Sequence, residues 1–169
     1  MMRKQLFGCA MLALSSSLSY AQTCNNTVPR TAPDSRYQVL GSGNEVKDTQ
    51  TGLIWQRCSI GQNWNGTTCE GSATTHTFKN ALQIAKDLGN GYRLPNIKEL
   101  LSLVEYGCYS PAINNNLFPN TLSHWYWSGS LQRASSIYAV GVSWLVDFDR
   151  GYSSYGNEPI YVRAVRSSQ

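Results

Sequence analysis

Tyr92-Arg93-Leu94-Pro95-Asn96-Ile97-Lys98-Glu99-Leu100 joins an extended segment to the start of a helix. Pro95 disfavours the α region for the residue before it, so the chain reaches the helix in an extended conformation. Asn96 and Glu99 have the N-x-x-E spacing of a capping box, in which the Asn side chain accepts a hydrogen bond from a free first-turn N–H group. We therefore predict a helix that begins after Asn96. Its apolar residues are Leu100, Leu101 and Val104, with Gly107 after its end.

A second helix is predicted on the N-terminal side of this stretch. Thr77 can cap its start, and Gly89 and Gly91 can end it. Between these limits, apolar residues recur on one helical face, as in an amphipathic helix that packs on a core. They are Phe78, Ala81, Leu82, Ala85 and Leu88.

Short β-prone runs lie on both sides of the helices. They are residues 37–40, 45–47 and 53–56 before the helices, and 125–127, 144–148 and 160–165 after them. Asp149-Arg150-Gly151 has the composition of a hairpin turn. Strands and helices do not alternate as in βαβ units, so the predicted class is α+β, with two helices packed on a mainly antiparallel sheet and long loops.

The first 21 residues have the features of a secretory signal peptide. Arg3 and Lys4 precede an apolar run from Leu6 to Leu14, and Ser19-Tyr20-Ala21 has small residues at the −3 and −1 positions. We predict cleavage before Gln22, and no segment has the length of a transmembrane helix. Residues 22–36, with two prolines and no periodicity, form an extended lead-in, and residues 37–169 form one domain.

Composition limits the classes of partner. The chain has 14 basic residues, and cleavage of the predicted signal peptide removes two of them, Arg3 and Lys4. The remaining 12 basic and 10 acidic residues give the cleaved chain a net charge of +2. A nearly neutral chain of this kind is not expected to bind nucleic acid.

Four cysteines, Cys24, Cys58, Cys69 and Cys108, remain after cleavage, and in an exported protein they predict two disulfides. Three pairings are open. We favour Cys58–Cys69, because Asn65-Gly66 between them predicts a tight turn, and this leaves Cys24–Cys108. A four-cysteine zinc site is disfavoured, because no two cysteines have C-x₂₋₄-C spacing.

Seven sequence blocks occur in an order that resembles the Lcl C-terminal domain family. This family was first described as a domain of unknown function and is named after the tip of a bacterial collagen-like adhesin. The resemblance implies a C-type-lectin-like fold and an exported recognition domain. The blocks are residues 33–37, 51–56, 92–100, 111–114, 118–121, 125–128 and 161–166.

The chain departs from the family pattern in two respects. Phe78 and Tyr92 stand where Trp is expected in many relatives, and both changes keep an aromatic ring. There is no Gly-x-y tract, so trimerisation through a collagen-like stalk is not implied and the oligomeric state stays open.

Catalytic and metal sites find little support, and we predict a non-enzyme without a cofactor. His76 and His124 have no sequence neighbours that complete a triad or zinc site. Asp147 and Asp149 can contribute to a calcium site, but no D-x-[DN]-x-[DN]-G loop is present. Glu158-Pro159 resembles the start of a lectin calcium motif, but Ile160 cannot ligate calcium. Arg163 and Arg166 are expected to pin the terminal strand to carboxylates or carbonyls.

Aromatic residues provide the remaining functional signal. Trp125, Trp127 and Trp144 lie in alternating strand patterns and are expected in the core. Exposed Tyr side chains offer apolar area and a hydroxyl group, which suits the binding of a glycan or a protein surface. The predicted binding residues are Tyr152, Tyr155, Arg150, Arg133 and Asn157.

Two functions remain open. The first is an exported recognition domain of adhesin type, in the periplasm, on the cell surface or released. The alternative is an accessory structural component of an envelope, pilus or secretion assembly that has no soluble ligand.

Overall fold

A computed structural model describes residues 21–132 and 142–168 of the chain. Residues 1–20, on which the signal-peptide prediction rests, lie outside these ranges, and so does Arg133. Within the described ranges, no helix has both the length and the apolar character needed to cross a membrane.

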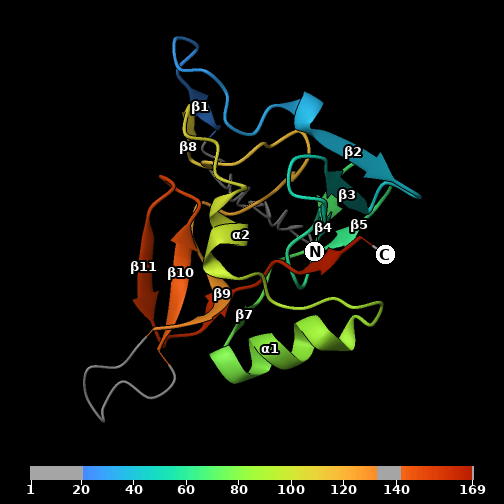
Figure 1. The fold of residues 1–169 in the computed structure, drawn as a ribbon, viewed down its shortest axis with the longest axis vertical. Helices are drawn as coiled ribbons and strands as arrows, with labels where there is room; N and C mark the ends of the chain where they lie inside the picture. Colours follow the sequence, from blue (N-terminus) through green and yellow to red (C-terminus); the bar gives the residue numbers. More distant parts are fainter. Residues whose placement is uncertain (1–20, 133–141, 169) are drawn as a thin grey trace, which may run out of the picture.

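The structure is α+β, with two α-helices, a 3₁₀ helix (Asp34–Arg36) and four small sheets in the described ranges (Figure 1). The α-helices are α1 (Phe78–Asp87) and α2 (Ile97–Leu101). The first five strands are β1 (Thr23–Cys24), β2 (Tyr37–Leu40), β3 (Glu45–Asp48), β4 (Leu53–Gln56) and β5 (Asn63–Trp64). The middle four are β6 (Cys69–Glu70), β7 (Thr75–His76), β8 (Cys108–Tyr109) and β9 (Trp125–Leu131). The last four are β10 (Ser143–Asp147), β11 (Ser153–Gly156), β12 (Ile160–Tyr161) and β13 (Val165–Ser167).

The largest sheet has the order β11-β10-β9-β12-β7 and is antiparallel except for the β9–β12 pair. Each of its faces packs against a core cluster. Tyr126 packs with Leu100 of α2 in one core cluster, and Trp127 packs with Ala81 of α1 in another. Because neighbouring residues of a strand point to opposite faces, α1 and α2 lie on opposite sides of this sheet.

The second sheet, β13-β4-β3-β2, adds a row of side chains to the α2 side of the core. Val46, Trp55 and Val165 face one another across three strands, and each is fully buried. Cross-strand apolar neighbours of this kind are the main stabilising contacts of a sheet.

Both helices begin at the predicted residues. The Thr77 side chain accepts a hydrogen bond from Asn80 N, and Asn96 and Glu99 form the complete capping box. Two expectations about their apolar faces are wrong. Leu82 and Leu88 are exposed because the small Ala81 and Ala85 make the close contact with the sheet, and α2 ends at Leu101, so Val104 pairs instead with Ile113 in an isolated β-bridge.

The predicted strand 160–165 is also wrong, because the segment divides between two sheets. Its start, β12, belongs to the large sheet, and its end leads into β13 of the second sheet. The crossing residues Val162, Arg163 and Ala164 are fully buried. The Arg163 guanidinium donates hydrogen bonds to Gln56 O at 2.9 Å and Arg57 O at 2.5 Å, which satisfies carbonyl groups at the point where the sheets separate.

The two disulfides join Cys58 to Cys69 and Cys24 to Cys108, which agrees with the favoured pairing. The first closes the β5–β6 hairpin. The Asn65 side chain accepts hydrogen bonds from two backbone N–H groups of its turn, and Gly66 has a φ of 101°, which favours glycine. The second joins β1 to β8 and fastens the lead-in to the domain.

Candidate functional site

The strands β10 and β11 form a hairpin whose four-residue turn, 148–151, is held rigidly. Gly151 N donates to Asp147 O at 2.8 Å, and Asp149 N donates to the Asp147 carboxylate at 2.9 Å. Gly151 has a φ of 81°, and a Cβ at this position would lie only 2.5 Å from Val104 Cγ1. The turn is also tied to the segment after α2, because Ser110 N donates to Asp149 O at 2.8 Å.

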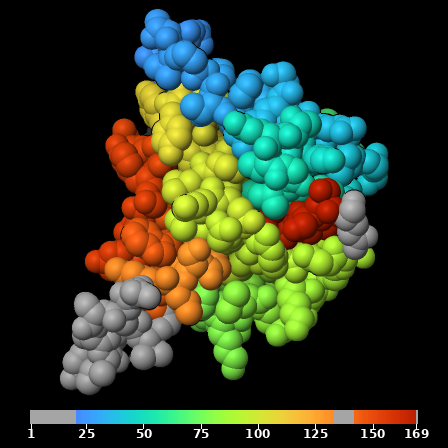
Figure 2. Space-filling model, viewed as in Figure 1, coloured from blue at the N-terminus to red at the C-terminus, as the bar shows by residue number. Residues whose placement is uncertain are grey.

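Exposed aromatic side chains surround this turn. Tyr106, Tyr109 and Tyr152 are 59%, 45% and 64% exposed. The Tyr106 ring lies beside Gly151, and the Arg150 guanidinium lies 5.7 Å from the Tyr109 ring centroid. We call Tyr106, Tyr109, Arg150 and Tyr152 the turn surface. Figure 2 shows its two contributing segments side by side, with the orange-red atoms of the hairpin next to the yellow atoms that follow α2.

The structure brings together only part of the predicted binding set. Tyr155 pairs with Trp144 across the hairpin, with ring centroids 6.2 Å apart, so it lies on the face of β10 that carries Val146. Tyr152 pairs with Asp147, whose side chain points to the opposite face. Asn157 is exposed beyond the end of β11, and Arg133 is outside the described residues. Tyr152 and Tyr155 therefore do not form one surface.

Sequence reasoning missed Tyr106 and Tyr109. Tyr106 lies in a segment predicted as the end of a helix, where an exposed residue looks like ordinary helix surface, and Tyr109 follows Gly107 in a stretch with no predicted element. The available signal was the cysteine, because a disulfide at Cys108 fixes the backbone on which both tyrosines stand.

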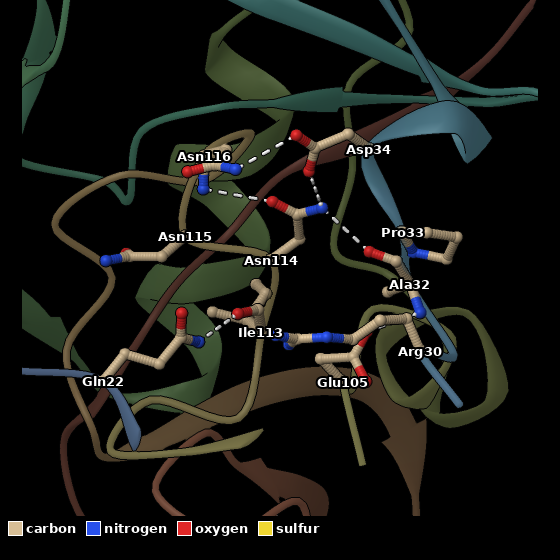
Figure 3. A pocket seen from close by; sticks show the side chains of 10 residues that line it. All are labelled: Gln22, Arg30, Ala32, Pro33, Asp34, Glu105, Ile113, Asn114, Asn115 and Asn116. Atoms are coloured by element: carbon tan, nitrogen blue, oxygen red, sulfur yellow. Dashed lines mark hydrogen bonds between the residues drawn. The ribbon is translucent and has the colours of Figure 1, made fainter. Parts of the chain in front are cut away.

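The Asn-rich loop borders a cavity of about 290 Å³ beneath the lead-in (Figure 3). Asn114 Nδ2 donates to Ala32 O at 2.8 Å and to Asp34 Oδ1 at 2.7 Å, and Asn116 Nδ2 donates to Asp34 Oδ2 at 3.0 Å. These amides are already engaged in holding the lead-in, so they serve its attachment.

Glu105 has the same role at the other side of this cavity. Its buried carboxylate accepts hydrogen bonds from the backbone N–H groups of Thr31, Ala32 and Gly107. A buried carboxylate that is satisfied by backbone donors is a structural anchor.

Two buried arginines also lack a carboxylate partner among the described residues. Arg57 donates to three backbone carbonyl groups and lies 4.0 Å from the Trp64 ring centroid. Arg163 adds hydrogen bonds to Ser59 and Thr121, and burial lowers its pKa to about 10. Both side chains are buried and bind neighbouring segments, which is the structural role expected for Arg163 from the sequence. Arg166 pairs instead with Glu45.

The described residues contain no group of three or more His, Cys, Asp or Glu side chains that can hold a metal ion. His76 Nε2 lies 2.8 Å from Thr74 Oγ1, and the His124 ring packs edge-on against Tyr161. Among the described residues, neither ring forms a hydrogen bond or ion pair with a carboxylate.

Comparison with known families gives one match, to the Lcl C-terminal domain over residues 44–166. The chain belongs to the Lcl C-terminal domain family. No curated protein and no solved structure matches the chain. The Lcl C-terminal domain match covers the whole large sheet and the turn surface, whereas Cys24 and the lead-in lie outside it. The disulfide between Cys24 and Cys108 therefore joins the lead-in to a residue inside the matched range.

Proposed function

We propose that this protein is an exported, non-catalytic recognition domain that binds a glycan or a protein surface through the turn surface. The observation that carries the proposal is the concentration of three exposed tyrosines and Arg150 around one rigid turn. Tyr and Arg are the residues that dominate binding hot spots, and fixed tyrosines lose little conformational entropy on binding.

Two further observations support this function. The two disulfides are typical of proteins in an oxidising compartment, and Cys24–Cys108 fixes the segment that carries Tyr109. The family is named after an adhesin, a class of protein that works by attachment. A C-type-lectin-like relationship also belongs to this proposal, because an α+β domain with long loops and two disulfides is compatible with it.

The test begins with a glycan array and with pull-down from envelope extract, followed by titration of each ligand found. We expect Tyr109→Ala and Arg150→Ala each to weaken binding by about 2 kcal/mol, roughly thirtyfold, with the melting temperature unchanged. Exposed side chains contribute little to stability, so the fold stays intact.

Tyr155→Ala is the matched control, because it removes an exposed tyrosine that lies on the face of the hairpin opposite Tyr152. If Tyr109→Ala and Arg150→Ala bind as tightly as this control, the turn surface is not the binding site. Incorporation of the protein into an envelope assembly, with no ligand in either screen, supports the structural alternative instead.

A further inference from the structure

A row of three side chains crosses the large sheet on its α1 side, at the end nearest the turn. The strand register pairs Asp147 with Trp125 on β9. Asp147 N donates to Tyr152 O at 2.8 Å, which places Tyr152 beside Asp147 on the other neighbouring strand. Residues paired directly across strands project from the same face, so Trp125, Asp147 and Tyr152 lie in one line with the carboxylate between the rings.

Packing places this row at an open margin of the sheet. Trp127 and Leu145, the next pair along the same face, are covered by α1 and belong to the core. Trp125 and Asp147 are only partly buried, and Tyr152 is mainly exposed. The row therefore begins where the cover of α1 ends.

The carboxylate of Asp147 is fixed and has hydrogen-bonding capacity left. Its Oδ1 accepts a hydrogen bond from Asp149 N at 2.9 Å, which sets the orientation of the group. Within residues 21–132 and 142–168, Oδ2 accepts no hydrogen bond, and no basic side chain forms an ion pair with Asp147. The nearby cation, Arg150, is paired with Asp149 at 3.4 Å.

We infer that this row binds one or two pyranose rings of a neutral glycan. A pyranose has an apolar C–H face, which packs on an aromatic ring, and neighbouring hydroxyl groups, which donate to a carboxylate. The outer strands of the row are two strand spacings apart, about 9.5 Å, so that the two rings can contact adjacent sugars. Asp147 and Asp149 disfavour an anionic ligand, because like charges repel when the ligand docks.

This inference rests on the proposed recognition function and specifies its ligand. The probes are cellohexaose and chitohexaose, two neutral oligosaccharides of flat pyranose rings, and dextran sulfate as the anionic comparison. Calorimetric titration of the exported protein should detect at least one neutral probe, with affinity unchanged between low and high salt, because no ion pair forms.

Asp147→Asn should weaken that binding at least about tenfold, since it removes charge-assisted hydrogen bonds. Tyr152→Ala should give a similar loss, and because this ring is mainly exposed, the variant should remain folded. The matched controls are Asp87→Asn, at the end of α1, and Tyr155→Ala, on the opposite face of the hairpin. Both should bind as the unmodified protein does.

Two outcomes overturn the inference and leave the recognition function intact. One is binding of dextran sulfate alone, or of an array or envelope ligand that is sensitive to Tyr109→Ala and not to Asp147→Asn. The other is neutral-glycan binding that neither Asp147→Asn nor Tyr152→Ala changes. Failure of every probe, array ligand and envelope extract would remove the inference and the function together.

Discussion

Arg163 shows how a single buried side chain can join separate sheets. Its side chain donates four hydrogen bonds within the described residues, to Gln56, Arg57, Ser59 and Thr121, and its guanidinium lies 5.0 Å from the Phe118 ring centroid. Burial of an arginine without a carboxylate is costly, and neutral acceptors offset the cost only when several are fixed in place. The sequence identified Arg163 as a pinning residue, but its partners come from segments too distant in the chain to be predicted.

The tryptophans also differ in a way that the strand pattern does not reveal. Trp127 is fully buried, and its Nε1 donates to His76 O at 2.7 Å. Trp144 was expected in the core, but it is partly exposed, because it lies near the sheet edge and packs on the exposed Tyr155. Alternation predicts which face a residue occupies, and the cover over that face depends on elements elsewhere in the chain.

This difference predicts unequal costs of truncation. Trp127→Ala should lower the free energy of unfolding by about 3–5 kcal/mol, since it opens a large cavity and leaves the His76 carbonyl group without its donor. Trp144→Ala should cost about 1–2 kcal/mol, because less apolar surface is lost. Urea denaturation measures both values. Equal costs would show that the two rings are buried to the same extent.

At the scale of elements, local signals located the helix starts and most of the predicted strands correctly. The capping box at Asn96 and the turn at Asn65-Gly66 depend on a few adjacent residues, so they are visible in the sequence. The division of residues 160–165 between two sheets is not visible in the sequence, because an apolar strand pattern does not indicate the neighbouring strand with which the segment will pair. The one residue that indicates this division is Arg163, which is charged and lies within an otherwise apolar run.

A cluster of charged groups links β3, β13 and the segment before α2. Arg166 donates to both carboxylate oxygens of Glu45, at 3.1 and 3.0 Å, and the Tyr92 hydroxyl group donates to the same carboxylate. The hydrogen bonds from Arg166 and then Tyr92 hold the pKa of Glu45 below its usual value. Burial, with the bond to Glu45, raises the pKa of Tyr92 to about 12.

This cluster predicts a pH dependence of stability. The folded pKa of Glu45 is below its unfolded value of about 4.3. The contribution of ionised Glu45 to the free energy of unfolding is therefore complete above about pH 5, and it is lost as the pH falls through the folded pKa. Glu45→Gln should therefore lower the free energy of unfolding by about 1 kcal/mol at pH 7, with a smaller difference at pH 3. Thermal melting from pH 3 to 7 tests this, with the exposed Glu158→Gln as control. A difference that does not change with pH would contradict the linkage.

At the scale of the whole molecule, the sequence predicted the class, the family and the disulfide pairing. The binding-site residues stay a prediction: Tyr152 and Arg150 lie beside the turn, Tyr155 lies on another face, and Tyr106 and Tyr109 are absent from the predicted set. The missing residues, Tyr106 and Tyr109, meet the hairpin through contacts such as Ser110 N to Asp149 O, across almost forty residues of chain. Such surfaces arise from tertiary packing and leave no periodic pattern.

The disulfide connectivity has a consequence for biogenesis. Cys58–Cys69 spans 11 residues and lies inside Cys24–Cys108, which spans 84. If the protein is exported as proposed, its N-terminus emerges first during translocation, so an oxidant that acts on each new thiol would join Cys24 to Cys58. Reaching the nested native pairing then requires thiol–disulfide exchange, which is slow without catalysis.

Peptide mapping after expression without a periplasmic disulfide isomerase should find Cys24–Cys58, whereas a Cys24→Ser/Cys108→Ser variant should mature independently of the isomerase. Supply of that isomerase, more than of oxidant, would then limit the yield of correctly bonded protein.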